Sequence, residues 1–307
     1  MRIAIYGTGG VGGYFGGRLA QAGEDVTFIA RGAHLDAIRS NGLRVSSVHG
    51  DFAVAGARAT DSPAEVGPVD AVLVAVKAWQ VSEVAPLIQP LVGPDTVVVP
   101  LQNGVEAAPQ LIEGLGPDNV VGGLCRVVAL IEGPGHIRHG GGDDFVGIAE
   151  LDNQPSERVE RVRAALAEAG LKAETPPDIY AALWAKFLFI CAWGGVGAVT
   201  RSAVGVTRSL PLTRAMLEGA MTETYNVARA RGINLPDTAV ATGMAAIDRQ
   251  PEGGEASMQR DIQDGRPSEL ESQNGAVVRL GRESGVPTPT HDFIYGSLLP
   301  QEQRARG

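Results

Sequence analysis

Short runs of continuously apolar residues alternate with helical stretches along the first half of the chain. Strand character is clearest at Ile3–Tyr6, Val26–Ala30, Ala71–Val76, Val97–Leu101 and in a fifth run beginning at Val120. Because consecutive positions are apolar, both faces of each strand are expected to be buried, as in a parallel sheet covered by helices. The pattern predicts an α/β fold built on a doubly wound parallel sheet.

Weaker signals in the same half predict additional strands. Residues Gly42 to Ala57 have the pattern of an inserted hairpin that turns around Gly50. Separate strands are expected near His136–His139 and at Phe145–Ala149.

The pattern changes after about residue 155. Ser156–Ala169 has the spacing of an amphipathic helix, and Lys172–Thr175 that of a short strand before the break at Pro176-Pro177. From Asp178 onward the chain is almost wholly helical in pattern, with glycines and prolines between the segments.

A chain of 307 residues is long enough for two domains. The change in pattern places a boundary near residue 176, with an α/β domain over 1–175 and an all-α domain over 176–307. The polar tail beyond Leu299 is expected to be frayed.

A glycine-rich segment between the first strand and the first helix carries the clearest chemical signal. It is G-x-G-x-x-G, made of Gly7, Thr8, Gly9, Gly10, Val11 and Gly12. Glycines there permit a tight turn, close approach of the backbone to a pyrophosphate and close contact of helix with sheet. The helix N-terminus offers free N–H groups to the phosphates. The segment predicts a Rossmann-type dinucleotide site; a purely structural glycine turn is the alternative.

The ends of the second and third strands suggest which dinucleotide is bound. The second strand ends Ile29-Ala30-Arg31 without the carboxylate that holds the ribose of NAD, whereas an arginine accommodates the 2′-phosphate of NADP. Lys77 follows the third strand and is a second candidate for phosphate. For both residues, the alternative is that they are ordinary cations on the protein surface. The pattern favours NADP.

Composition narrows the class of protein. With 35 acidic and 26 basic residues the net charge is −9, which argues against general affinity for nucleic acid or an anionic membrane. The longest apolar run, Phe187–Val199, is too short to span a bilayer, and no signal-peptide pattern opens the chain. Cys125 and Cys191 are expected to be reduced thiols of a cytoplasmic protein.

The histidines show no spacing typical of metal ligands, and no metal is predicted. They are His34, His49, His136, His139 and His291. His136 and His139 are expected to flank a surface strand.

Lysine is scarce, with three residues against 23 arginines. Lys186 lies in the apolar stretch Trp184–Trp193, where burial would lower the pKa of an amine so that it could release a proton. The alternative is a lysine that extends from a buried helix to solvent.

Motifs spread over nearly the whole chain resemble the ketopantoate reductases (2-dehydropantoate 2-reductases). They are the glycine segment, Lys77–Val81, Leu101–Val105, Leu183–Phe187, Ser257–Ile262, Ser268–Leu270 and Asn274-Gly275. The resemblance implies a Rossmann domain followed by a helical domain, with the active site between them. It further implies NADPH-dependent reduction of a 2-keto acid, foremost 2-dehydropantoate to pantoate in pantothenate biosynthesis.

The resemblance also implies roles for individual residues. Arg31 and Lys77 would contact the phosphates of NADP, and Asn103 would lie near the nicotinamide and the substrate. Lys186 would be the catalytic acid and would also contact the substrate.

Ser257 and Glu269 would bind the substrate, with Glu269 taking part in catalysis by accepting a hydrogen bond from the substrate hydroxyl. Glu269 has a second explanation, because Ser268 and Glu271 match a capping box at a helix start.

Two positions depart from the family pattern. On a helix, residues 190 and 194 share a face with Lys186, and the family places asparagines there. This chain has Ile190 and Gly194, which make the site more apolar. A more apolar 2-keto acid therefore stays open as substrate, as does another two-domain hydroxy-acid or opine dehydrogenase. An NADP-binding regulatory protein is the non-enzyme alternative, and a homodimer is expected by analogy.

Overall fold

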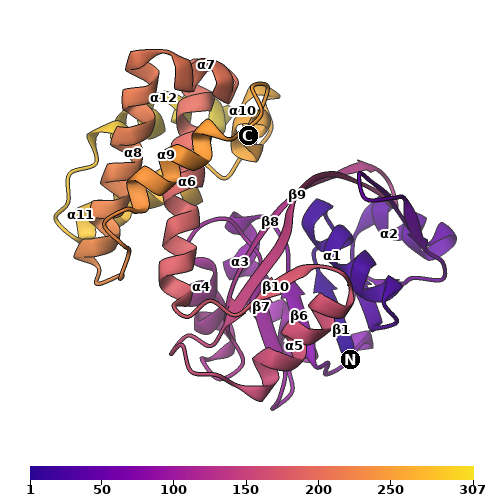
Figure 1. Cartoon of the computed structure of the whole chain (residues 1–307). Helices are drawn as coiled ribbons and strands as arrows, with labels where there is room; N and C mark the ends of the chain where they lie inside the picture. The colour runs from indigo at the N-terminus through magenta and orange to yellow at the C-terminus, as the bar shows by residue number, and fades with distance from the viewer. The chain divides into compact units, whose positions relative to one another are not determined.

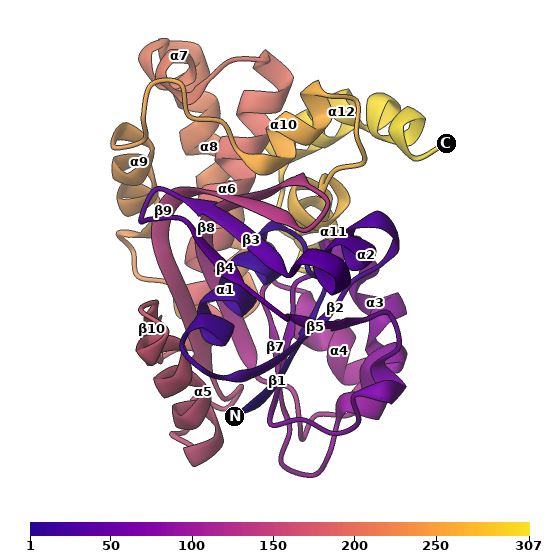
Figure 2. The ribbon, with the colours of Figure 1, turned by 90° about the vertical axis from the view of Figure 1, so that its right-hand side faces the viewer.

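The computed structural model describes all residues from 1 to 307 (Figure 1 and, turned by 90°, Figure 2). The strands are β1 Arg2–Tyr6, β2 Asp25–Ile29, β3 Leu43–Ser47, β4 Phe52–Val54, β5 Arg58–Thr60, β6 Ala71–Val74, β7 Val97–Pro100, β8 Gly122–Gly133, β9 His136–Ala149 and β10 Lys172–Glu174. The α-helices are α1 Gly10–Gln21, α2 Gly32–Asn41, α3 Val81–Val84, α4 Ala107–Leu115, α5 Glu157–Glu168, α6 Ile179–Thr200, α7 Val204–Ser209, α8 Pro211–Ala230, α9 Ala239–Asp248, α10 Ser257–Gln263, α11 Ala276–Glu283 and α12 Pro289–Arg306.

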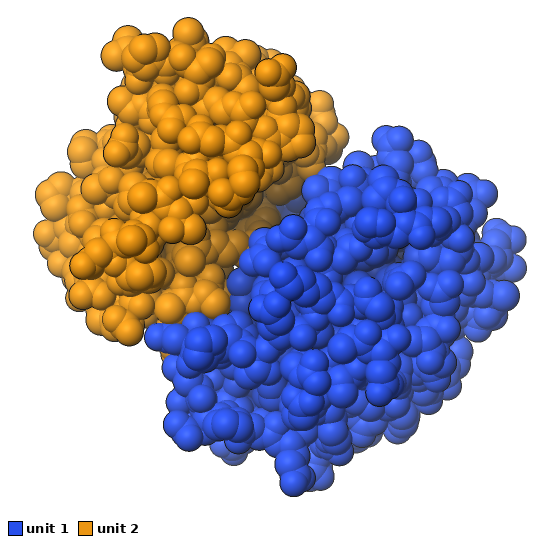
Figure 3. All heavy atoms as spheres, in the orientation of Figure 1, with its two compact units in different colours: residues 1–102, 106–179 blue, residues 103–105, 180–307 orange.

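These elements form two compact units, coloured separately in Figure 3. The first comprises Met1–Gln102 and Glu106–Ile179, and the second Asn103–Val105 and Tyr180–Gly307. The first unit contains all the strands, and the second is helical. The short segment Asn103–Val105 belongs to the helical unit although only Leu101 and Gln102 separate it from strand β7 in the sequence.

A five-stranded parallel sheet, in the order β5-β2-β1-β6-β7, forms the centre of the first unit. Ile3, Ile5 and Leu73 enter the hydrophobic core on the side of α1, α2 and α5, whereas Ala4 and Val72 enter a second core on the side of α3 and α4. Successive side chains thus enter two different cores, which explains why the strands are apolar at every position. The predicted doubly wound parallel sheet is confirmed.

The fifth strand of this sheet is not the predicted one. β8 begins at Gly122 and runs antiparallel to β9 in a second sheet, while Val120 makes only an isolated bridge to Val98. The fifth place is taken by β5, at the edge beside β2. β5 is only three residues long and begins with an exposed arginine, so it lacks the apolar run by which the other strands were recognised.

The second sheet has the order β10-β9-β3-β4, with β8 pairing with β9. The predicted hairpin is confirmed, because β3 and β4 are antiparallel. The two strands expected near His136 and Phe145 form one continuous strand, β9, that includes the glycines at 140–142. Register shifts between β8 and β9 accommodate this glycine-rich stretch, since a bulge permits pairing to continue through an irregular segment.

Helix α6 is the central element of the second unit's core. Its Phe187 and Cys191 are buried with Leu217 and Met221 of α8 and with Val277 of α11. By length and composition this 22-residue helix could cross a membrane, which the 13-residue apolar run had not suggested, and 61% of its most apolar stretch is buried inside the protein. The same apolar character therefore contributes to packing within the second unit.

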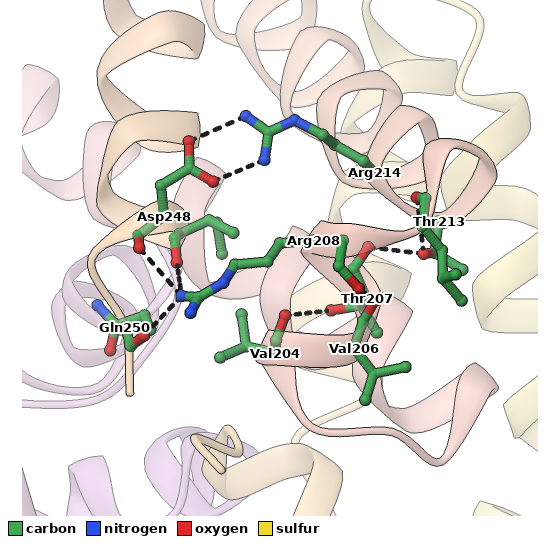
Figure 4. A network of polar contacts seen from close by, with 11 residues as sticks. Val204, Val206, Thr207, Arg208, Thr213, Arg214, Asp248 and Gln250 are labelled. Carbon is green, nitrogen blue, oxygen red and sulfur yellow. Dashed lines mark hydrogen bonds and ion pairs between the residues drawn. The ribbon is translucent and has the colours of Figure 1, made fainter. Parts of the chain in front are cut away.

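Polar contacts fix the end of α9 in the second unit (Figure 4). The Arg208 guanidinium donates hydrogen bonds to the carbonyl oxygens of Ile247, Asp248 and Gln250, at 3.1, 3.0 and 2.6 Å. Arg214 makes a bidentate pair with the Asp248 carboxylate, at 2.6 and 2.9 Å. Carbonyl groups at a helix C-terminus lack partners within the helix, so Arg208 supplies donors to them from outside, while Arg214 holds the Asp248 side chain.

The C-terminal tail is ordered as helix, and the prediction of a frayed end is wrong. α12 continues to Arg306, and Glu302 on it is buried. The Glu302 carboxylate accepts hydrogen bonds from the Ser268 backbone N–H at 3.0 Å and from Arg306 Nε at 2.7 Å. A polar sequence forms an ordered helix here because its carboxylate satisfies a buried backbone donor.

Candidate functional site

In the glycine turn after β1, one glycine faces open space and the others lie against neighbouring atoms, so that a side chain would not fit there. Gly7 has φ +96°, a conformation that favours glycine. A Cβ on Gly12 would lie 2.3 Å from the Gly7 carbonyl oxygen, whereas a Cβ on Gly9 would meet no atom within 4 Å. The space beside Gly9 lies at the N-terminus of α1, where N–H groups and the helix dipole favour an anion. The turn therefore fits the pyrophosphate of a dinucleotide.

Helix α1 is held between both sheets of the first unit by its other glycines. A Cβ on Gly16 would lie 2.6 Å from Ile5 Cγ1 on β1, and one on Gly13 would lie 2.6 Å from Ile137 Cγ1 on β9. The absence of side chains on both faces brings the helix close to both sheets. This packing fixes the direction in which the helix N-terminus points.

Arg31 and Lys77 lie beyond the carboxyl ends of two strands that flank β1 in the sheet. Arg31 follows β2 and is the exposed N-cap residue that directly precedes α2. Burial raises the pKa of Tyr6, the last residue of β1, and the positive charge of Arg31 partly offsets this rise. Because such an effect requires proximity, Arg31 lies near the end of β1. Lys77 follows β6, and its Nζ lies 5.7 Å from the centre of the Trp79 ring. The two cations and the glycine turn thus lie together at the carboxyl ends of the central strands, which is where ligands bind in such folds.

A second group of polar residues lies in the helical unit, around Glu269. This carboxyl group is buried, and its Oε2 accepts hydrogen bonds from Asn103 Nδ2 at 3.3 Å and from Gln273 Nε2 at 3.2 Å. The structure therefore brings together Asn103 and Glu269, two of the predicted site residues that are far apart in the sequence. Gln273 was not among the predicted residues. Its signal was the spacing of four residues from Glu269, which places two side chains on one helical face.

The capping box considered as an alternative at this helix start does not form, although the Ser268 hydroxyl accepts a hydrogen bond from the Leu270 backbone N–H at 3.2 Å. The Ser268 hydroxyl donates to the Glu302 carboxylate at 2.5 Å, and the Glu271 carboxylate accepts from Arg279 and from the Tyr295 hydroxyl. Residues Glu271–Gly275 form a π-helical turn, labelled η4, instead of a regular first turn. Such turns occur frequently at functional sites.

Lys186, Ile190 and Gly194 follow one face of α6 in the same unit. Lys186 and Ile190 are half-buried, and Gly194 is buried. A Cβ on Gly194 would lie 3.2 Å from Met258 Cε, so the helix surface there is in contact with the segment that begins α10. The remaining predicted residue, Ser257, is half-buried and is the first residue of α10.

The first unit contains one group of side chains whose ligand atoms are close enough to hold a metal ion. Nitrogens of His49 and His139 and a carboxylate oxygen of Asp144 lie within 4.8 Å of one another. His139 is buried and stacks on Tyr14, which corrects the expectation of a surface position. Tyr14 also donates to Asp144 at 2.9 Å, so the group has partners of its own within the protein. The prediction that no metal is bound stays a prediction.

The fold and this geometry define the class of protein. A parallel sheet, with a glycine turn and cations at one edge, forms a unit that binds a nicotinamide dinucleotide, and a helical unit carries a buried carboxylate held by amides. Family models identify the chain more closely: the one described as Ketopantoate reductase PanE/ApbA matches residues 3–153, and its C-terminal counterpart matches 178–302. The chain belongs to the ketopantoate reductase family.

Individual relatives agree with this family. The 2-dehydropantoate 2-reductase of Mesorhizobium japonicum is 32% identical, over 96% of this chain and 95% of its own. The crystal structure of a PanE/ApbA family ketopantoate reductase from Ralstonia eutropha JMP134 is 32% identical, with a TM-score of 0.91 and full coverage of both chains. The ternary structure of D-mandelate dehydrogenase with NADH and anilino(oxo)acetate is 25% identical, with a TM-score of 0.89 over 100% of this chain and 99% of that one.

Proposed function

We propose that this protein reduces 2-dehydropantoate to pantoate with NADPH. The observation that carries the proposal is that each of the two units contains a group of residues suited to one part of this reaction. The first unit has an anion-binding glycine turn with two cations beside it, and the second has Glu269 held by Asn103, with Lys186 on α6. Family membership over both units supports the oxidoreductase activity.

The residues divide the chemistry between them. When bound, the nicotinamide supplies a hydride to the carbonyl carbon of the keto acid, and negative charge develops on the carbonyl oxygen. The Lys186 ammonium stabilises that charge and donates the proton that completes the alcohol. An arginine could stabilise the charge but could not release a proton near neutral pH. Glu269 accepts a hydrogen bond from the hydroxyl of the substrate, and Ser257 contacts the same molecule.

The preference for NADPH rests on the end of β2. Arg31 stands where NAD-dependent proteins place a carboxylate, and its guanidinium suits a 2′-phosphate. Lys77 contributes a point charge to the phosphates from the end of β6, on the other side of β1. Gly10 and Val11, the first residues of α1, supply backbone N–H groups to the pyrophosphate, whereas the Thr8 N–H donates to the Ile29 carbonyl oxygen at 3.2 Å and supports the turn from within.

A second candidate substrate is a 2-keto acid with an apolar substituent. Ile190 and Gly194 cannot supply the amide hydrogen bonds that asparagines would, and D-mandelate dehydrogenase, which shares the fold, acts on an aromatic 2-hydroxy acid by its name. Both candidates involve the same hydride transfer to the carbonyl of a 2-keto acid.

The test is to follow consumption of NADPH and NADH with ketopantoate, phenylglyoxylate and other 2-keto acids. Fastest turnover of ketopantoate with NADPH supports the first candidate, and fastest turnover of phenylglyoxylate supports the second. Absence of turnover with every acid would refute both. A cytoplasmic homodimer stays a prediction, which sedimentation and cell fractionation test.

A further inference from the structure

Gln273 is fully buried and makes a contact that orients the substrate-binding carboxylate. It lies in the π-helical turn η4, and its Nε2 donates to Glu269 Oε2 at 3.2 Å. Asn103 Nδ2 donates to the same oxygen at 3.3 Å. Two amides on one carboxylate oxygen restrict rotation of the carboxylate about its last side-chain bond. The direction in which Glu269 accepts further hydrogen bonds is thereby fixed.

The hydrogen bond to Glu269 sets the orientation of the Gln273 amide and leaves the amide oxygen without a partner. Gln273 Oε1 is buried and has no hydrogen-bond partner. Turning the amide over would direct its oxygen at the carboxylate, which repels it, so Nε2 must face Glu269. A buried acceptor without a partner is costly, and such a group in a native fold calls for an explanation.

Gly194 on α6 provides the space into which this amide points. A Cβ at position 194 would lie 3.6 Å from Gln273 Oε1, 3.2 Å from Met258 Cε and 3.5 Å from Ala256 Cβ. A side chain at 194 would share this space with the Gln273 amide and the Met258 methyl group. The family pattern places an asparagine at this position of α6, whereas here an amide approaches the same part of the helix from η4.

We propose that Gln273 is a positioning residue that holds Glu269 to accept a hydrogen bond from a hydroxyl group of the keto acid, and so selects hydroxylated 2-keto acids. The inference rests on the proposed function and specifies its substrate class. It favours ketopantoate over apolar acids despite the loss of the asparagines at 190 and 194. Gln273 itself need not touch the substrate, since its effect passes through Glu269.

Two acids that differ by one hydroxyl group test this role. Ketopantoate and trimethylpyruvate share the same carbon skeleton, and only ketopantoate has the hydroxyl. In Gln273→Leu we expect KM for ketopantoate to rise about 10-fold, as for loss of a well-oriented hydrogen bond. We expect kcat with ketopantoate and both constants for trimethylpyruvate to change less than about twofold, because neither depends on that bond.

Gln259→Leu is the matched control. Gln259 is also fully buried with an unpaired Oε1, but its Nε2 donates to the Ser202 carbonyl at 3.0 Å and not to Glu269. The control should leave the ratio of kcat/KM for the two acids at its wild-type value. Gln273→Met, with an unbranched side chain of similar length, replaces the leucine variant if that variant does not fold.

Equal losses for both acids, or an unchanged ratio in the Gln273 variants, would overturn the positioning role while leaving the reductase activity in place. If the wild-type protein turned over neither acid with NADPH, the proposed function would fail, and the role of Gln273 with it. A selective loss for ketopantoate in the Gln273 variants alone would support the inference.

Discussion

Replacement of Gly9 by alanine separates the binding of the dinucleotide from the stability of the fold. Gly9 has φ −82°, which alanine adopts without strain, and its Cβ would meet no atom within 4 Å. We therefore expect the free energy of unfolding to change by less than about 0.5 kcal/mol. The added methyl group would occupy the space where the pyrophosphate approaches the backbone. Loss of one hydrogen bond to a charged group costs about 1.5–3 kcal/mol, so Kd for NADPH should rise roughly 10- to 150-fold.

Gly12→Ala is the contrasting variant in the same turn. Its Cβ would lie 2.3 Å from the Gly7 carbonyl oxygen and 2.9 Å from Ile5 Cγ2, so backbone would have to move. Overpacking of this kind costs about 1–3 kcal/mol and should lower Tm by roughly 2–10 °C.

Isothermal titration with NADPH and thermal unfolding of each variant measure the two effects. Wild-type affinity in Gly9→Ala would refute the assignment of this space to the pyrophosphate. A Tm loss in Gly9→Ala as large as that in Gly12→Ala would show that the position is structural.

Three further predictions concern single residues. In Arg31→Leu, KM for NADPH should rise roughly 10- to 100-fold through loss of a charge-assisted contact, while KM for NADH stays the same; steady-state kinetics with both cofactors measure this, and parallel changes would contradict it. Burial lowers the pKa of His291, whose Nδ1 accepts from Asn274, so the unfolded chain takes up a proton at higher pH than the folded one. Its contribution to stability is complete above about pH 6.5 and is lost as the pH falls below that value. Urea unfolding between pH 8 and 5 should show a falling midpoint, less steep in His291→Gln, and an equally steep fall in that variant would exclude His291 as the cause. Burial raises the pKa of the Cys191 thiol, so a thiol reagent should label this residue only after unfolding; mass spectrometry of the native protein measures this, and rapid labelling would contradict the burial.

The strands of the parallel sheet could be predicted because each lies between two cores. β1 and β6 bury neighbouring residues on opposite faces, which leaves an unmistakable apolar run. β5 was not predicted because Arg58–Thr60 has no apolar run. Its place at the edge of the sheet comes from pairing with β2. β8 was placed in the wrong sheet because an apolar run indicates burial but not the partner strand.

The candidate site could be predicted in part. Asn103 and Glu269 were identified by resemblance, and the structure shows the hydrogen bond that joins them across 166 residues of sequence. Gln273 was not predicted because it lies between the two motifs Ser268–Leu270 and Asn274-Gly275 that carry the resemblance, and no pattern in the sequence shows where its amide points. The partners of Ser268 and Glu271 are distant in sequence, and only folding reveals them.

The ordered C-terminus has the same cause. The tail is polar, and its composition alone indicates a frayed end. Glu302 is nevertheless buried, because the backbone N–H of Ser268 requires an acceptor there. A contact of this kind leaves no pattern in the sequence around residue 302.

The most direct test of the account is NADPH consumption with ketopantoate by the wild-type protein and by Lys186→Ala and Lys186→Arg. Loss of a proton donor should lower kcat by about 10²- to 10⁴-fold in both variants, since arginine does not release a proton. Kd for NADPH should remain at the wild-type value. Wild-type turnover in Lys186→Ala, or full activity in Lys186→Arg, would contradict the assignment of Lys186 as the catalytic acid.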